Sequence, residues 1–537
     1  MRSSRTVLAA TLVFGAALSL HARTPQAPAV SPQPPAALGA PAGDPPRNAP
    51  PGRGGGRGNP TGALYTATCS GCHGTGIEGG RAPSLFDDKW THATDDESMA
   101  AIIANGIPTT EMVGFKAALN EAQIWQLVAY VRTQGAGLKE KPQLVTDPNG
   151  QIVKTEKQAF RIEVVARDLE TPWGLAFLPD GRLLITERPG RLRIVEKGTL
   201  LTEPVKGTPK VWEKQDGGLL DVEVHPQYSR NGWIYLAYSE TLAGYTPPAA
   251  GEAATAPAHV ATPQGGRGLG GPPDPPSMTV VVRGKLDKNN EWTDQQVIFR
   301  APPELYSSTN AHYGSRFIFD TQGHLFFTIG EKNVMTHAQD LSDPLGKIHR
   351  VNDDGTVPKD NPFVNRAGAV PTIWSYGHRH PQGLSWNPVD GSLWESEHGP
   401  QGGDEINIIK PGHNYGWGVI TMGIQPGITK RAEEGMEQPV VYYTPTIAPS
   451  GITFYSGTKY PGWSNNLFVS GLAGQQLRRL EIAGDKVTHQ EVLFNQFGRI
   501  RDVVVGPEGY LYVAMQLPGQ SLSQSTPGVV VRLVPVP

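Results

Sequence analysis

The sequence predicts an all-β six-bladed propeller at about residues 160–537, preceded by a small all-α domain at about residues 59–137. Two observations predict the propeller. Six segments share one pattern, in which a short apolar strand, a turn containing Pro, Asp or Gly, and a second strand follow each other. The pattern recurs at roughly 40 to 70 residues, which is typical of four-stranded blades and not of a β-sandwich. The six segments are 175–188, 222–239, 317–331, 384–399, 452–471 and 503–516.

The chain begins with two arginines, Arg2 and Arg5, followed by an apolar run at 7–20. A bilayer-spanning helix needs roughly 20 apolar residues, so the run favours an export signal at 1–22 over an uncleaved membrane anchor. No other stretch is apolar enough to suggest a stable membrane span. Residues 23–58 are rich in Pro, Ala and Gly, which predicts a flexible linker. We therefore expect a periplasmic or secreted protein.

Composition limits the function classes. The formal net charge is -3 and charged residues make up 18% of the chain, so the sequence offers no basic face for nucleic acid. The 64 glycines and 49 prolines favour turn-rich β structure over a helical bundle.

Cys69 and Cys72 are the only cysteines, and His73 follows them directly. A zinc site needs about four ligands, usually in two pairs, and no second pair exists. A thioredoxin-like site would need a βαβ pattern around the two cysteines. CxxCH is the haem-attachment string, so we expect covalent haem c on both thiols with iron bound by His73.

The sixth iron ligand is expected to be Met112, 39 residues after His73 in the loop GIPTTEMVGF. This arrangement resembles class I cytochromes c, in which a loop methionine binds iron axially. Met99 is the alternative, but its helical segment favours a core position. A closing helix is predicted after Asn120 because apolar residues recur at helical spacing. These residues are Ile124, Leu127, Val128 and Val131.

Residues 138–159 are read as a connector between the two domains. The strand at 160–165 is expected to pair with 529–534 and so close the propeller ring. The low-complexity segment at 245–277 is read as an insertion in the second blade.

Unusual polar residues in the propeller predict a site with one base, several guanidinium groups and a hard-cation position. His225 ends an apolar strand, and Arg499 and Arg501 share one face of a strand because they are two residues apart. Arginine clusters bind carboxylates, and acidic side chains with backbone oxygens suit Ca²⁺. The remaining members of the set are Arg379, His380, Asp404 and Glu405.

Several long phrases resemble the soluble quinoprotein glucose/sorbosone dehydrogenase family, nearest the bacterial aldose sugar dehydrogenases. The phrases are GGLLDV..HP, WSYGHR.PQGL, EHGP.GGDEIN...GHNYGW, APSGITFY and RIRDVVVGPEG, and the likeness covers nearly all of 160–537. The resemblance implies a six-bladed propeller that binds pyrroloquinoline quinone (PQQ) and Ca²⁺ at one mouth.

The resemblance also implies roles for individual residues. His225 would be the base that takes the proton from the anomeric hydroxyl. Arg379 would contact the quinone at that end, with His380 beside it where the family usually has asparagine. Arg499 and Arg501 would hold the cofactor carboxylates.

The resemblance assigns the calcium ligands as well. Backbone oxygens of Gly399 and Pro400 would bind the Ca²⁺ that bridges to the quinone, and Glu405 and Tyr415 would bind a structural Ca²⁺. Two further departures from the family pattern are Ala473 in place of a lysine and Asp216 in place of a glutamine. Loss of the lysine is expected to weaken quinone affinity.

The two halves together predict a quinohaemoprotein that oxidises an aldose at C1 to the lactone and passes electrons through its own haem to an external acceptor. One alternative is a calcium-binding propeller that recognises carbohydrate or protein without catalysis and carries an electron-transfer cytochrome. A second is a propeller lactonase, which would have no use for a haem.

Overall fold

The computed structural model describes residues 60–536, apart from 78, 86–89, 91, 139–141, 246–273 and 519–525. The expected export signal, the linker at 23–58 and most of the insertion at 245–277 lie outside the described residues. Within the described ranges, no helix combines the length and the apolar character needed to cross a bilayer.

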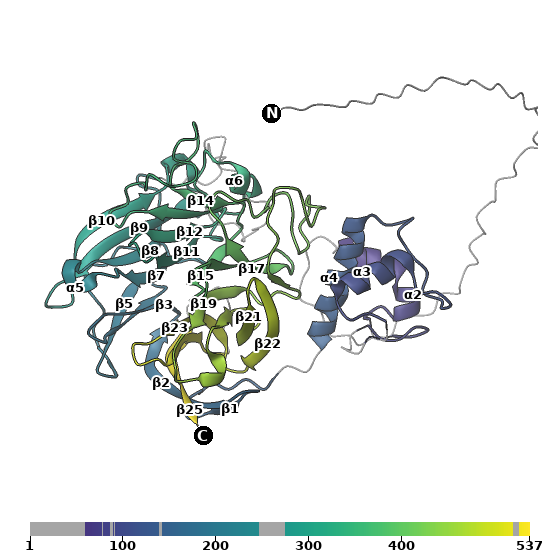
Figure 1. Cartoon of the computed structure of the whole chain (residues 1–537), viewed down its shortest axis with the longest axis horizontal. Coiled ribbons are helices and arrows are strands. Elements are labelled where there is room, and N and C mark those ends of the chain that lie inside the picture. Colours follow the sequence, from purple (N-terminus) through teal and green to yellow (C-terminus); the bar gives the residue numbers. More distant parts are fainter. Residues whose placement is uncertain are drawn as a thin grey trace, which may run out of the picture. The chain divides into compact units, whose positions relative to one another are not determined.

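The N-terminal domain is helical, and α4 closes it as the sequence predicts (Figure 1). The Asn120 side chain accepts a hydrogen bond from the Gln123 N–H, and the Gln123 side chain accepts one from the Asn120 N–H, so two free backbone donors at the helix start are satisfied. The predicted stripe on α4 is 1–6% exposed and packs in one core with Tyr65 and Met99. The helices are α1 (Pro60–Thr68), α2 (Ser70–His73), α3 (Asp96–Asn105) and α4 (Glu121–Leu138).

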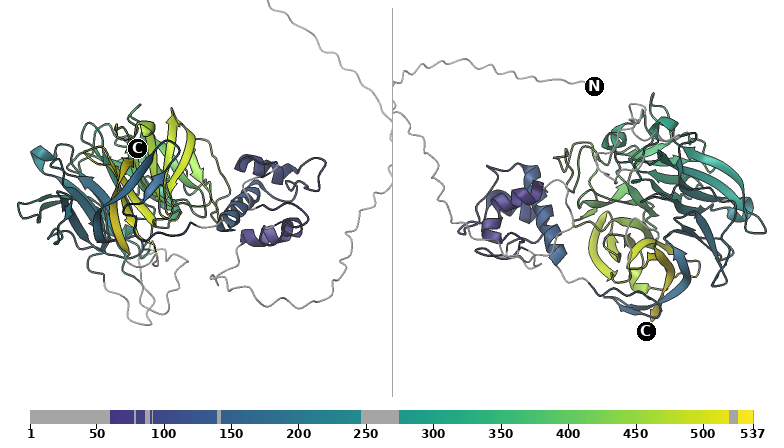
Figure 2. Two further views of the ribbon diagram at one scale, coloured as in Figure 1. Left: turned by 90° about the horizontal axis from the view of Figure 1, so that it is seen from below. Right: turned by 180° about the vertical axis from the view of Figure 1, so that it is seen from behind.

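The rest of the described chain forms six antiparallel sheets, the blades of a six-bladed propeller (Figures 1 and 2). The six predicted hairpins are the two innermost strands of each blade. The innermost strands are β3 (Pro172–Phe177), β7 (Leu219–Val224), β11 (Gly314–Phe319), β15 (Pro381–Trp386), β19 (Pro449–Tyr455) and β23 (Arg499–Val505). The second strands are β4 (Leu183–Glu187), β8 (Ile234–Thr241), β12 (Leu325–Ile329), β16 (Leu393–Glu397), β20 (Asn466–Gly471) and β24 (Leu511–Gln516).

The outer strands complete each blade. The third strands are β5 (Arg191–Glu196), β9 (Ser277–Leu286), β13 (Lys347–Val351), β17 (Asp404–Ile409), β21 (Gln476–Ala483) and β25 (Pro527–Val536). The fourth strands are β6 (Thr199–Leu200), β10 (Trp292–Arg300), β14 (Ile373–Tyr376), β18 (Val441–Tyr443), β22 (Lys486–Phe494) and β2 (Ala159–Glu170). The short helices α5 (Tyr228–Asn231) and α6 (Met335–Gln339) lie in loops between strands.

The sixth blade is built from both ends of the propeller sequence. Strand β2 pairs with β25 in antiparallel register, with Ile162 opposite Leu533, which confirms the predicted ring closure. In Figure 2 the blue β2 runs beside the yellow C-terminal strand. Strand β1 (Ile152–Lys154), which belongs to the expected connector, adds a fifth strand to this blade.

Strand direction explains where polar loops gather. The six innermost strands lie side by side around the ring. Each second strand returns antiparallel to the first, so residues just before an innermost strand and just after a second strand reach the same end. We call this end the mouth. Residues that follow an innermost strand lie at the opposite end.

A buried cation ties the innermost strands together at the propeller axis. Arg316 on β11 lies 3.0 Å from Asp221 on β7 and 3.0 Å from Asp502 on β23. Asp502 also accepts the Leu175 N–H of β3, and Arg316 donates to the Gln382 carbonyl of β15. Burial raises the pKa of both aspartates, and the Arg316 charge opposes that rise.

Glycine lets the sixth innermost strand reach this cluster. A Cβ on Gly451 of β19 would lie 2.0 Å from Asp502 Oδ1, and one on Gly174 of β3 would lie 2.5 Å from Asp221 Oδ1. Any larger residue at either position would displace a carboxylate from Arg316. All six blades therefore meet at one ionic cluster, which we call the axial clasp and define as Asp221, Arg316 and Asp502.

Replacing Arg316 by Met should lower the free energy of unfolding by about 3–5 kcal/mol, because two buried carboxylates lose their cation. The loss should shrink as the pH falls toward about 4, since protonation then removes the buried charges. Urea denaturation at several pH values measures both effects. The control is Arg300→Met, whose exposed pair with Glu240 should contribute less than about 1 kcal/mol. Equal losses for the two variants would contradict the role of the clasp.

Candidate functional site

Four of the predicted site residues meet at the mouth. Arg379 and His380 directly precede β15, and Arg499 and Arg501 lie at the start of β23. Burial lowers the pKa of all three guanidinium groups, and Arg499 lowers that of Arg501 further. Arg501 is 8% exposed, and its Nε has no hydrogen-bond partner among the described residues. Such an excess of buried positive charge suits a ligand with several carboxylates.

A fourth arginine, Arg188, joins this group from the loop after β4. It is 4% exposed, and its charge lowers the pKa of both Arg499 and Arg501. Its guanidinium donates to the Gln215 carbonyl and lies 3.3 Å from Glu213. The positive charge of the mouth therefore does not depend on a residue at position 473, where Ala473 follows β20.

The structure does not bring His225 to the mouth, so the prediction that it is the base is wrong. His225 follows the end of β7 and therefore lies at the opposite end of the ring. Its ring packs against Tyr235 and Phe319. Its Nδ1 accepts the Gln227 N–H, and its Nε2 lies 3.7 Å from Asp353. These contacts describe a histidine that holds loops together.

His312 occupies the position that the prediction gave to His225. It precedes β11 at the mouth, and its Nδ1 lies 3.0 Å from Oε1 of Glu331, in the loop after β12. Although burial opposes ionisation, the contact with His312 and the charge of Arg379 lower the pKa of Glu331, so this carboxylate is charged. A carboxylate on Nδ1 fixes the ring and leaves Nε2 to accept a proton, which is the arrangement of a general base.

His380 stacks on His312 at 4.9 Å and makes an edge contact with His398 at 4.8 Å. The Gln382 amide nitrogen donates to the Gly314 carbonyl and to Nε2 of His380, so the proton of the neutral ring lies on Nδ1. Burial and the neighbouring His398 hold its pKa well below the usual value. His380 is therefore a neutral donor, and the base of this imidazole group is His312.

A narrow cavity of about 10 Å³ adjoins Arg379. It is lined by both predicted sets of calcium residues, which are Gly399 and Pro400, and Glu405 and Tyr415. The carbonyl oxygens of Gly399 and Pro400 accept no hydrogen bond from the described residues. Asp404, in contrast, accepts four donors, from Gly399, Thr446, Ile447 and Ala448. Asp404 therefore shapes the loop and has little capacity left for a cation.

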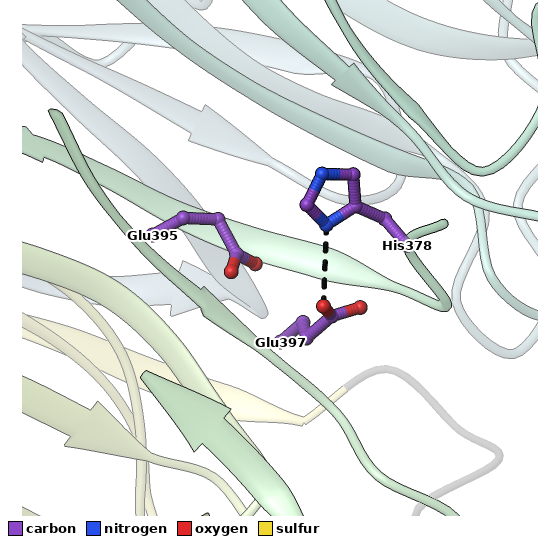
Figure 3. Close-up of side chains that lie close together, drawn as sticks. All are labelled: His378, Glu395 and Glu397. Atoms are coloured by element: carbon purple, nitrogen blue, oxygen red, sulfur yellow. Dashed lines mark hydrogen bonds and ion pairs between the residues drawn. The ribbon is translucent and has the colours of Figure 1, made fainter. Parts of the chain in front are cut away.

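Two buried carboxylates, Glu395 and Glu397, and the half-buried Glu405 surround one amide beside this cavity. Glu395 and Glu397 lie on β16, and Glu405 lies on the neighbouring strand β17, directly opposite Glu397. Asn407 Nδ2 lies 3.1–3.4 Å from all three carboxylates. His378 Nδ1 lies 3.2 Å from Glu397 Oε1 (Figure 3). We call these five residues the acid cluster.

The acid cluster fits a hard divalent cation. Ligand atoms of His378, Glu395 and Glu397 lie within 4.8 Å of one another, and Figure 3 shows the three side chains converging. Burial raises the pKa of Glu395 and Glu405 well above the usual value, and the Glu397 charge adds to the rise. Glu395 Oε1 and Asn407 Oδ1 are buried without a partner among the described residues. Unpaired oxygens and excess negative charge are what Ca²⁺ requires.

The Tyr415 hydroxyl is not available as a calcium ligand, because its hydrogen bonds are already made. The hydroxyl donates to the Ile408 carbonyl and accepts the Lys410 N–H, and the Tyr415 ring stacks on His378 at 4.7 Å. A cation at Glu405 would therefore find its other ligands in the acid cluster, and not in the Tyr415 hydroxyl.

The helical domain presents the residues expected for a covalent haem. Cys69 and Cys72 are free thiols on either side of the start of α2. His73 Nδ1 lies 3.0 Å from the Pro83 carbonyl, so Nδ1–H is the donor and Nε2 remains for iron. Met112 is half-buried in the loop between α3 and α4, whereas Met99 is 7% exposed within the core. The residues fit the group, and Met112 as sixth ligand stays a prediction.

Fold and site together define a class of protein in which a six-bladed propeller with a cation-rich mouth is joined to a c-type cytochrome domain. Residues 169–523 match the family model described as Glucose / Sorbosone dehydrogenase, and residues 58–131 match Cytochrome C oxidase, cbb3-type, subunit III. The chain belongs to the glucose/sorbosone dehydrogenase family, and its N-terminal region carries a cytochrome c domain.

Individual relatives agree with this assignment. The chain is 41% identical over 361 residues to aldose sugar dehydrogenase YliI of Escherichia coli, covering 66% of this chain and 89% of the relative. It is 26% identical over 451 residues to quinoprotein glucose dehydrogenase B of Acinetobacter calcoaceticus, covering 69% and 88%. The crystal structure of the apo-form of the E. coli aldose sugar dehydrogenase superposes with a TM-score of 0.60 at 37% identity, covering 70% of this chain and all of that one.

The signal that would have found His312 is its place in the repeat. In each blade the residues just before the innermost strand reach the mouth. NAHYG precedes β11 as GHRHP precedes β15, whereas the HP of VEVHP follows β7. Aligning the six hairpins by strand number would therefore have separated His312 from His225.

Ca²⁺ should raise the midpoint of thermal unfolding of chelator-treated protein by several degrees, because binding at 100 times Kd stabilises by about 2.7 kcal/mol. Glu395→Gln should raise the midpoint without Ca²⁺, since one buried charge is lost, and should abolish most of the Ca²⁺-dependent rise. Differential scanning calorimetry measures both. Glu203→Gln, at an exposed position, is the matched control and should retain the full response. A full response in Glu395→Gln would place the cation elsewhere.

Proposed function

We propose that this protein oxidises the C1 hydroxyl of an aldose to the lactone with PQQ bound at the mouth, and that the electrons pass through its own haem c to an external acceptor. Membership of a sugar dehydrogenase family and the names of its relatives support the reaction class. The observation that carries the proposal is the pairing, at one mouth, of buried arginines with a carboxylate-oriented histidine. We further propose a periplasmic or secreted location, from the expected export signal.

Each mouth residue has a role in this reaction. His312 takes the proton of the anomeric hydroxyl at Nε2, and Glu331 stabilises the positive charge that forms on the ring. The Arg379 guanidinium donates a hydrogen bond to the His398 carbonyl. The Arg379 backbone N–H donates to the Glu397 carboxylate, which fixes the position of this residue. Arg499 and Arg501 bind the cofactor carboxylates, with Arg188 adding to the local positive charge.

PQQ, when bound, accepts a hydride from the sugar carbon, which the side chains of this chain cannot do. The residues present fit such a group, because the buried Nε atoms of Arg188, Arg379 and Arg501 have no hydrogen-bond partner among the described residues. Arg379 and the neutral N–H of His380 are placed to stabilise negative charge that develops on a ligand oxygen. A cation held by the acid cluster would fix Glu397 and, through it, the Arg379 backbone.

The cytochrome domain gives the chain a one-electron acceptor. Only six residues separate Leu138, the last of α4, from Val145, whose N–H donates to the Gln496 carbonyl of the propeller. A short covalent link raises the effective concentration of donor and acceptor relative to two separate proteins. Haem reduction within one chain therefore would not depend on protein concentration.

The proposal is tested by adding PQQ and Ca²⁺ to purified haem-loaded apoprotein with a panel of aldoses and following the reduced haem band. We expect reduction with at least one aldose and none with a sugar alcohol that lacks an anomeric hydroxyl. The initial rate per molecule should stay constant on dilution. If dithionite reduces the haem and no aldose does so, the proposed function is wrong.

His312→Gln should lower kcat by about 10²–10⁴-fold, because the proton loses its acceptor, while PQQ affinity changes little. His225→Gln is the control and should stay within about threefold of the unaltered protein, since that histidine lies at the other end of the ring. Turnover measured with a soluble dye acceptor makes the assay independent of the haem. A loss in His225→Gln as large as in His312→Gln would restore the original assignment of the base.

A further inference from the structure

Asp216 is an exposed carboxylate at the mouth, in the turn just before β7. Its Oδ2 accepts a hydrogen bond from the backbone N–H of His312 at 3.2 Å, and the Asp216 backbone N–H donates to the Asn310 carbonyl at 3.0 Å. Asp216 is thus held against the segment that carries the base. Its Oδ1 accepts no hydrogen bond from the described residues and remains available to a ligand.

The charge of Asp216 reaches residues of three other blades. Burial lowers the pKa of Arg379 in the fourth blade and of Arg499 and Arg501 in the sixth, and the Asp216 charge raises each of these pKa values in part. It acts in the same way on Lys332 in the third blade. A carboxylate on the second blade can affect all of these groups only if it faces the middle of the mouth.

The charge balance of the mouth changes when an anionic cofactor binds. PQQ carries three carboxylates, which would offset Arg379, Arg499 and Arg501, whereas Arg188 is paired with Glu213. Lys332 adds little positive charge, because burial holds its pKa well below the usual value. Asp216 and Glu331 then leave the mouth with excess negative charge, and only Asp216 is exposed to an incoming substrate.

We propose that Asp216 is a specificity-determining residue that selects aldoses carrying a protonated amine next to the reacting carbon. This inference rests on the proposed function and names its substrate class. Asp216 contacts the backbone of His312, so we expect a substrate whose C1 hydroxyl meets Nε2 of His312 to bring its C2 substituent, one carbon away, within reach of this carboxylate. An ammonium group there gains a charge-assisted hydrogen bond and a Coulomb attraction that a hydroxyl lacks. A 2-amino aldose is therefore preferred over its neutral parent.

The test compares glucosamine, glucose and N-acetylglucosamine as substrates of the haem-loaded, PQQ- and Ca²⁺-reconstituted protein at about pH 6.5, where the amine is protonated. In Asp216→Asn the ratio of kcat/KM for glucosamine to that for glucose should fall about 10-fold or more, since one hydrogen bond to a charged group is lost. The ratio for N-acetylglucosamine to glucose should not change. Asp180→Asn removes one charge from the turn between β3 and β4, at the opposite end of the ring, and should leave both ratios unchanged.

A second readout needs no turnover. Titration of the apoprotein with PQQ, followed by quinone absorbance, should give a Kd several-fold lower for Asp216→Asn, because a negative charge facing the cofactor carboxylates is removed. If Asp216 only positions the His312 segment, Asp216→Asn would lower kcat/KM equally for all sugars and would not tighten PQQ binding. That result would overturn the inference.

The two proposals fail in different ways. If the unaltered protein oxidises no aldose, the proposed function is wrong. If it oxidises aldoses and Asp216→Asn leaves the glucosamine-to-glucose ratio unchanged, the proposed function stands and the role of Asp216 is wrong.

Discussion

The constraint on which the rest of this structure depends is the ionic cluster at the propeller axis. A ring of six sheets has no central element, so its innermost strands must be held at a fixed distance from one another. Arg316 does this by binding two carboxylates from strands on different sides of the axis. Buried charges of this kind contribute little net stability, but they are costly when misplaced and so specify one arrangement of the blades. The register of the blades in turn determines which loops reach the mouth.

The charged groups at the mouth destabilise the folded protein as long as no ligand binds them. Burial lowers the pKa of Arg379, Arg499 and Arg501, the Arg499 and Arg188 charges lower that of Arg501 further, and the acid cluster carries the opposite imbalance. Glu397 accepts the Arg379 backbone N–H, but no salt bridge among the described residues joins a mouth guanidinium group to a carboxylate of the acid cluster. Each group is instead complementary to a ligand of opposite charge, an anion at the arginines and a cation at the carboxylates. Such unpaired burial is expected at functional sites, where stability is exchanged for ligand affinity.

Most of the fold could be predicted from the sequence because its signals are local. The CSGCH string, the stripe on α4 and the six hairpins each lie within about 20 residues. Arg379, Arg499 and Arg501 were found because their surrounding phrases are long. His312 and Glu331 were missed because their meaning depends on strand direction, which decides whether a loop reaches the mouth. The acid cluster was found only at Glu405, since its other members are brought together by the pairing of β16 with β17.

The sixth blade bears on how the chain folds. Its strands come from opposite ends of the propeller sequence, β2 at residue 159 and β25 ending at residue 536. During synthesis, five blades can emerge while the partner of β2 does not yet exist, and the unpaired edge of β2 is then open to association with other chains. The helical domain closes within fewer than 80 residues and has no such delay. Loss of only the last ten residues would therefore remove most of β25 and leave the ring open. The propeller would then be exposed to proteases, while the N-terminal helical domain would stay folded.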